Sequence, residues 1–119
     1  MSSPVGHVLG FGHIIVGAGA ILAPFTAAKA FQLIQAPSTV FVTRAFGSRD
    51  LVLGLGIQLY DRGTPENKIA TLACGVIHTI DVLNALVSYA QSYLPIEALV
   101  VAGSIDATLV ALCWWELNS

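Results

Sequence analysis

The sequence predicts an all-α integral membrane protein, an antiparallel bundle of four helices that each cross the bilayer. Apolar composition, four long apolar runs and the short breaks between these runs support this fold class. Of the 119 residues, 55% are hydrophobic and 10% are charged, and the mean hydropathy is +0.78. Soluble domains carry about 25% charged residues, so too few polar side chains are present to cover a soluble surface. The alternative is a soluble all-α bundle enclosed in a larger assembly.

Charge and cysteine usage exclude several classes of function. The formal net charge is −2 and the chain has no basic run, so nucleic acid is not an expected partner, because phosphate binding needs clustered Lys and Arg. Cys74 and Cys113 lack a CxxC spacing, which favours packing over redox chemistry. The N-terminus lacks the basic region of a signal peptide, so the first helix is expected to be retained. The length favours one domain over residues 1–119.

The first expected span covers residues 7–31. Six residues share one of its faces: Gly6, Gly10, His13, Gly17, Ala20 and Pro24. Small residues let helices approach closely in lipid, so this face should turn into the bundle and carry His13 inward. Pro24 is expected to kink the end of the helix. His13 is then either a hydrogen-bonded structural residue or part of a binding site.

The second expected span, residues 40–60, interrupts an apolar run with Arg44, Arg49 and Asp50. A charged side chain at the centre of a bilayer costs about 2.5–3.5 kcal/mol on insertion scales. We therefore expect Arg49 or Arg44 to pair with an acid of its own or of a neighbouring helix, although Arg44 could instead extend to the membrane interface. One face of this span contains Gly47, Asp50, Gly54 and Ile57.

The third and fourth expected spans cover residues 68–93 and 96–116, and each has one aspartate near its centre, Asp81 and Asp106. The polar loop 61–68 precedes the third span. Its Arg62 and Lys68 lie on the side of both termini, so the positive-inside rule favours cytosolic termini. A polar or small stripe, expected to face inward, runs along the third span through Thr71, Cys74, His78, Asp81, Ala85 and Ser88, with Asn84 beside it. The stripe of the fourth span contains Leu99, Gly103, Asp106, Val110 and Cys113.

The three central acids point to acid/base chemistry, because four antiparallel helices allow them to face one cavity. Several acids beside an arginine can hold one carboxylate ionised and another protonated, which supplies a base and an acid in a dry pocket. Epoxide opening suits such a pair. The candidate catalytic residues are Asp81, Asp50, Arg49, His78 and Asp106. The candidate substrate-binding residues are Arg44, His13, Asn84 and Cys74. No cofactor is expected. Metal binding through His78, Asp81 and His13 is an alternative, but no metal site is expected, because no HxxxH or ExxH spacing is present.

The same residues are also consistent with a non-enzymatic function. Charged residues in a small bundle can fix the register of its helices through an ion-pair network. The protein would then be a non-enzymatic assembly partner or a small carrier. A cavity lined by the acids favours the enzyme, whereas fully paired carboxylates without a void favour the structural network.

The stretch from Arg44 to Gly56 resembles the R-x-x-G-x-R-D-x-x-L-G pattern of DUF4267, a family of small four-span membrane proteins. The stretch from His78 to Leu86 is similar to its second signature, an Asp followed by a polar residue three positions later, here Asp81 and Asn84. Family members often have Asp at the later position. Members occur in bacteria and fungi, some of them in natural-product pathways. The resemblance implies a four-span fold and is compatible with hydrolase or cyclase activity on polyketide or terpenoid epoxides.

The expected function is thus a membrane-embedded, cofactor-independent acid/base enzyme that opens epoxides in a lipophilic substrate, by hydrolysis or cyclisation. The expected partners are the membrane and that substrate. Glycines on the first two spans make a homodimer plausible. For a fungal member, the endoplasmic reticulum is the expected host membrane.

Overall fold

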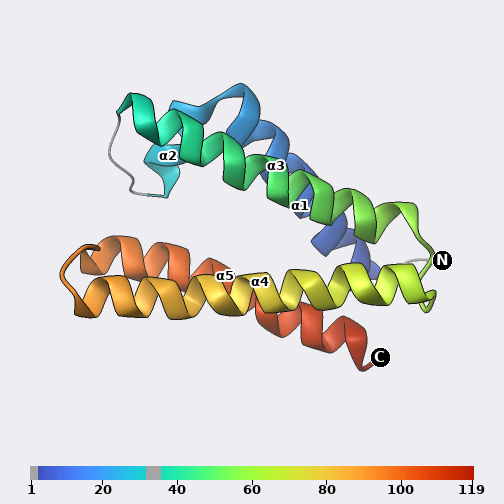
Figure 1. Cartoon of the computed structure of the whole chain (residues 1–119). Helices are drawn as coiled ribbons and strands as arrows, with labels where there is room; N and C mark the ends of the chain where they lie inside the picture. The colour runs from blue at the N-terminus through green and yellow to red at the C-terminus, as the bar shows by residue number, and fades with distance from the viewer. Residues whose placement is uncertain (1–2, 32–35) are drawn as a thin grey trace.

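The protein is built from helices, and the four long ones alternate in direction along the chain (Figure 1). The computed structural model describes residues 3–31 and 36–119. Within these ranges the helices are α1 (Pro4–Leu22), α2 (Pro24–Ala30), α3 (Pro37–Leu59), α4 (Pro65–Ala90) and α5 (Ile96–Leu117). The predicted all-α class is therefore confirmed.

Three of the described helices, not the four expected, are long and apolar enough to cross a membrane. These helices are α1, α4 and α5. Although α3 has 23 residues, every 18-residue stretch of it contains Arg44, Arg49 and Asp50. These three charges make α3 less apolar than the long helices α1, α4 and α5.

The first expected span is wrong as a single helix over residues 7–31. Helix α1 ends at Leu22, and Ala23 leaves the helical region with φ −132° and ψ 65°. Pro24 then begins α2. Proline disfavours a helical conformation at the residue before it, so the chain breaks at Ala23 where a kink within a continuous helix was expected.

The turn between α3 and α4 is fixed by polar residues. Thr64 is the N-cap of α4, and its side chain accepts a hydrogen bond from the amide of Asn67 at 3.3 Å. The Asn67 side chain donates to the carbonyls of Ile57 and Tyr60 at 2.9 and 3.1 Å, where the carbonyls at the end of α3 have no partner within the helix. Gly63 supplies the positive φ of 89° that the turn requires.

Helices α1 and α3 pack antiparallel with their backbones almost in contact. A Cβ added to Gly17 would lie 2.6 Å from the carbonyl oxygen of Gly47, and one added to Gly54 would lie 2.6 Å from that of Gly10. All four glycines are buried. The small-residue faces predicted for these two segments therefore do form their contact.

Helices α4 and α5 form the second antiparallel pair. The predicted inward stripe of α4 is confirmed, because Thr71, Cys74, His78 and Ala85 are buried. Few side chains of α5 are buried, namely Ala98, Cys113 and Glu116. The outer surfaces carry large apolar residues, among them Val8, Ile15, Leu22, Phe41, Val52, Ile69, Ile80, Leu83, Val100 and Trp115. Polar groups inside and apolar groups outside are typical of a protein that faces lipid.

Both ends of the described chain meet the α3–α4 turn. Glu116 accepts a hydrogen bond from the Ser3 hydroxyl at 2.5 Å and pairs with Arg62 Nε at 3.1 Å. Its side chain is 5% exposed. These contacts join α1, α5 and the turn at one end, whereas the ribbons of the two helix pairs diverge toward the opposite end (Figure 1).

Candidate functional site

Arg49 of α3 links two carboxylates on different helices. Its Nη2 lies 3.0 Å from Oδ2 of Asp81 on α4, and its Nη1 lies 3.4 Å from Oδ1 of the same residue. The same Nη2 also lies 3.5 Å from Oδ1 of Asp50. The guanidinium stacks over the Phe46 ring at 4.7 Å from its centroid, which orients the charged group. One arginine therefore holds both acids in a single network.

His78 of α4 extends this network to α5 and α1. Its Nδ1 donates to Oδ1 of Asp106 at 2.7 Å and lies 3.7 Å from Oδ2 of Asp81. Its Nε2 lies 2.7 Å from Nε2 of His13. The five candidate catalytic residues and His13 thus form one chain of contacts across α1, α3, α4 and α5.

The acids are only partly covered. The side chains of Asp50, Asp106 and Asp81 are 14%, 17% and 22% exposed, and that of His78 is 3% exposed. Oxygens of Asp81 and Asp106 lie within 4.8 Å of each other and of a His78 ring nitrogen. The carboxylates are therefore concentrated around a buried histidine and remain reachable from outside.

Two of the candidate substrate-binding residues contact other parts of the molecule. Arg44 is exposed and donates through Nε to the carbonyl of Ile21 at 3.1 Å. Asn84 is exposed one turn beyond Asp81, and its side chain lies 3.5 Å from the Ser88 hydroxyl. Neither of these contacts reaches the network of acids. Arg44 therefore ties α3 to the end of α1.

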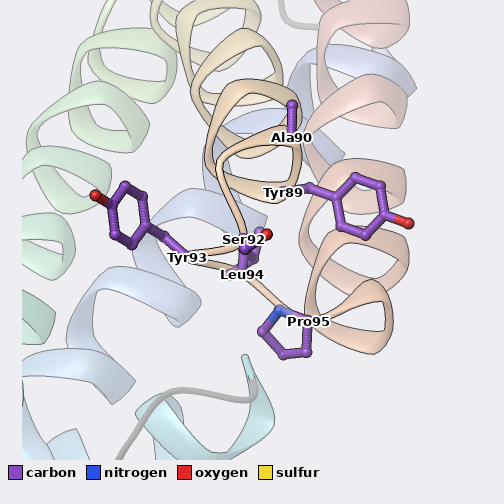
Figure 2. A pocket seen from close by; sticks show the side chains of 6 residues that line it. All are labelled: Tyr89, Ala90, Ser92, Tyr93, Leu94 and Pro95. Carbon is purple, nitrogen blue, oxygen red and sulfur yellow. The ribbon is translucent and has the colours of Figure 1, made fainter.

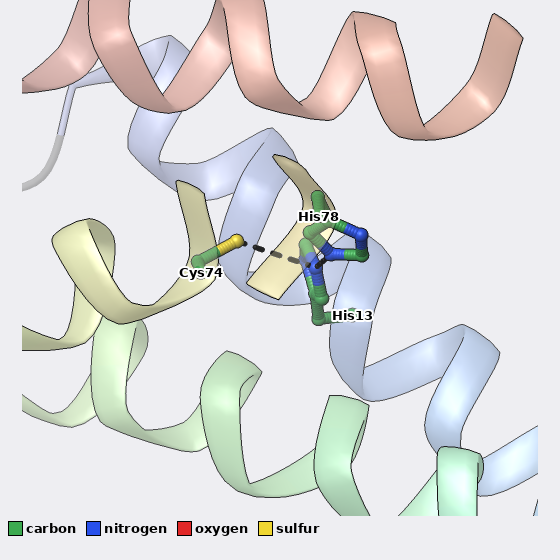
Figure 3. A group of neighbouring side chains, drawn as sticks. All are labelled: His13, Cys74 and His78. Carbon is green, nitrogen blue, oxygen red and sulfur yellow. Dashed lines mark hydrogen bonds between the residues drawn. The ribbon is translucent and has the colours of Figure 1, made fainter. Parts of the chain in front are cut away.

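Cys74, the remaining candidate, lies at the buried end of the network. Its Sγ is 3.5 Å from His13 Nε2 (Figure 3). It is also 3.2 Å from Cys113 Sγ. The sequence placed Cys74 and Cys113 on facing stripes but gave no relative register of the two helices. Their contact, and that of Glu116 with Arg62, could therefore not be predicted.

A surface pocket of about 590 Å³ lies at the turn between α4 and α5 (Figure 2). Tyr89 and Tyr93 point to opposite sides of this turn. The pocket is lined by Tyr89, Ala90, Ser92, Tyr93, Leu94 and Pro95, and so by none of the acids. It is a feature of the tyrosine-rich turn, separate from the network.

Two groups of side chains have donor atoms close enough to hold a metal ion. One contains His13, Cys74 and His78, and the other contains His78, Asp81 and Asp106. The prediction of no metal site weighed His78, Asp81 and His13 and set them aside because no HxxxH or ExxH spacing is present. The donors in each observed group come from two helices. This kind of arrangement leaves no motif in the sequence.

Comparisons with protein-family models, with curated proteins and with solved structures find no match to this chain. The resemblance to DUF4267 therefore stays a prediction, and the function has to be argued from the arrangement of the residues.

Proposed function

We propose that the protein is a membrane-embedded acid/base enzyme that opens epoxides in a lipophilic substrate. The observation that carries this proposal is the position of Arg49, whose Nη2 contacts both Asp50 and Asp81. Two carboxylates that share one guanidinium are held in a defined geometry and in unlike environments. Such pairs allow one group to act as base and the other as acid.

Asp81 is the base in this proposal. Both of its oxygens accept hydrogen bonds from Arg49, which fix the direction of the carboxylate. Asp50 is the proton donor. Its Oδ1 is buried and accepts no hydrogen bond from the described residues beyond its 3.5 Å ion-pair contact. Asp106 orients His78 through the 2.7 Å hydrogen bond.

The proposed reaction is balanced within these groups. Asp81 takes a proton from water or from a hydroxyl of the substrate, and the oxygen so activated attacks an epoxide carbon. The carbon–oxygen bond of the epoxide breaks, and its oxygen receives the proton of Asp50. Water as nucleophile gives a diol, and a substrate hydroxyl gives a cyclic ether. The proton on Asp81 then returns to Asp50 through water.

We further propose that α3 is a fourth span. Its charges are compatible with the bilayer because Arg49 pairs with acids on the inner side, and Arg44 bonds the carbonyl of Ile21. Ionisable residues within membranes normally face such an interior and pair there. The endoplasmic reticulum as host membrane and a homodimer stay predictions from the sequence.

The experiment is turnover of long-chain and terpenoid epoxides by the purified protein in detergent, in water labelled with ¹⁸O. We expect the diol to contain one ¹⁸O atom. Asp81→Asn should lower the rate at least about 100-fold, since a general base contributes about 10²–10⁴. The matched control is Thr79→Ala on the same helix, because the Thr79 hydroxyl bonds only the Gly75 carbonyl of its own helix.

A structural ion-pair network is the second candidate, because each of the three acids already has a partner. The pocket at the α4–α5 turn, which none of the acids lines, favours it as well. A structural network predicts no turnover of any epoxide and a large loss of stability in Asp81→Asn. That pair of results, with a folded wild-type protein, would refute the enzyme.

A further inference from the structure

His13 and His78 meet ring nitrogen to ring nitrogen between α1 and α4. Their Nε2 atoms are 2.7 Å apart, and each residue is 3% exposed. Nδ1 of His13 lies 2.7 Å from the Leu9 carbonyl oxygen, and Nδ1 of His78 lies 2.7 Å from an Asp106 oxygen. Carbonyl and carboxylate oxygens only accept, so both Nδ1 atoms carry the hydrogen.

A neutral imidazole has one N–H, so each Nε2 then presents a lone pair to the other. Two lone pairs at 2.7 Å repel each other unless a positive centre lies between them. That centre is either a shared proton, which makes one ring an imidazolium, or a metal ion. The choice between them depends on whether further donors surround the same point.

Cys74 provides such a donor. Its Sγ lies 3.5 Å from His13 Nε2, and one donor atom from each of His13, Cys74 and His78 lies within 4.8 Å of the others. The three side chains converge from α1 and α4 (Figure 3). The next nearest sulfur is Cys113 Sγ, 3.2 Å from Cys74 Sγ. Two imidazoles with one or two thiols form a donor set typical of zinc.

The distances suit a zinc ion after a small movement. With Zn–N of about 2.0–2.1 Å and Zn–S of about 2.3 Å, tetrahedral ligands lie about 3.3 Å apart for two nitrogens and about 3.6 Å apart for nitrogen and sulfur. The observed sulfur–nitrogen distance of 3.5 Å already agrees. The two Nε2 atoms have to separate by about half an ångström, which a rotation of one ring supplies.

The surroundings of this cluster also match a zinc site better than those of the group formed by His78, Asp81 and Asp106. Metal-bound histidines usually donate their other N–H to a carboxylate or a backbone carbonyl, as His78 and His13 do here. In the second group, Asp81 is already bonded twice by the cationic Arg49. The Nδ1 of His78 that faces that group carries the hydrogen.

We propose that His13, Cys74 and His78 bind a zinc ion, with Cys113 as the nearest further ligand. The ion joins α1 to α4 and thereby connects the two antiparallel helix pairs. The ion would be bound by Nε2 of His78, whereas Nδ1 of the same ring bonds Asp106. The inference rests on the buried cluster alone and does not depend on the proposed epoxide chemistry.

The test is the metal content of the purified full-length protein after addition of zinc and dialysis. We expect about one zinc ion per chain in the wild type, and at least a tenfold lower content in Cys74→Ala and His13→Gln. Replacement by Co²⁺ should give the absorption bands of a tetrahedral site with a thiolate ligand. This second readout uses the wild type, so it holds even where a variant fails to fold.

The control is Asp81→Asn, which should keep its zinc although the proposed chemistry requires Asp81. Loss of turnover with retained zinc separates the two proposals. Two results would overturn the zinc site: less than about a tenth of an ion per wild-type chain, or equal zinc content in the wild type and both ligand variants. In that case a proton shared by the two imidazoles explains the 2.7 Å distance.

Discussion

Gly17→Ala tests the close contact that brings α1 and α3 together. The new Cβ would lie 2.6 Å from the Gly47 carbonyl oxygen and from the Leu51 amide nitrogen, against about 3.5 Å for an unstrained contact. Both neighbours are backbone atoms and cannot rotate away, so the helices have to separate. Overpacking of this kind costs about 1–3 kcal/mol. Because His13 is one turn from Gly17, the same shift displaces the site.

The matched controls are Gly12→Ala and Gly19→Ala on the same helix, where a Cβ meets no atom within 4 Å. These two variants should be up to about 1 kcal/mol more stable, because alanine favours a helix over glycine. The free energy of unfolding of each of the three variants is measured from the helix content, followed by circular dichroism during titration with a denaturing detergent. Equal stability of Gly17→Ala and Gly12→Ala would refute the close packing of α1 on α3.

Two further variants test the polar contacts at the end of the bundle where the termini lie. Asn67→Ala removes two hydrogen bonds to carbonyls at the end of α3 and should lower the free energy of unfolding by about 1–3 kcal/mol. Lys68 is exposed, so Lys68→Ala should change the free energy of unfolding little. Similar losses in both variants would contradict a stabilising role of the Asn67 side chain at the end of α3. Glu116→Gln loses the ion pair with Arg62 but can still accept from Ser3, so in thermal unfolding it should be destabilised less than Glu116→Ala. Equal destabilisation of the two variants would contradict this and show that the charge pair dominates the contact.

Periodicity predicted the inward faces because each of them repeats within one helix. Gly6, Gly10 and Gly17 of the predicted α1 face are buried, and so is most of the polar stripe of α4. The break at Ala23 was missed because the apolar pattern continues through Pro24, and only the local backbone restriction ends the helix. The assignment of a span to α3 relied on pairing to offset its three charges, and these charges leave α3 outside the set of helices apolar enough to cross a membrane by composition.

The candidate site was predictable only where depth in the membrane determines position. Asp50, Asp81 and Asp106 were placed at one level by counting residues, and the structure brings their side chains into one network through Arg49 and His78. Contacts that depend on the rotation of one helix against another were not predictable. The approach of Cys74 to Cys113 and the facing rings of His13 and His78 belong to this class.

The most direct measurement is the free energy of unfolding and the epoxide turnover of Asp50→Asn, taken on the same preparation. Asp50 is the proposed proton donor, and its one contact with Arg49 is long, at 3.5 Å. An acid/base enzyme predicts a loss of turnover of at least about 100-fold in a protein that stays folded. A fall in stability of several kcal/mol, with unchanged turnover per folded molecule, would contradict catalysis and show that the network is structural.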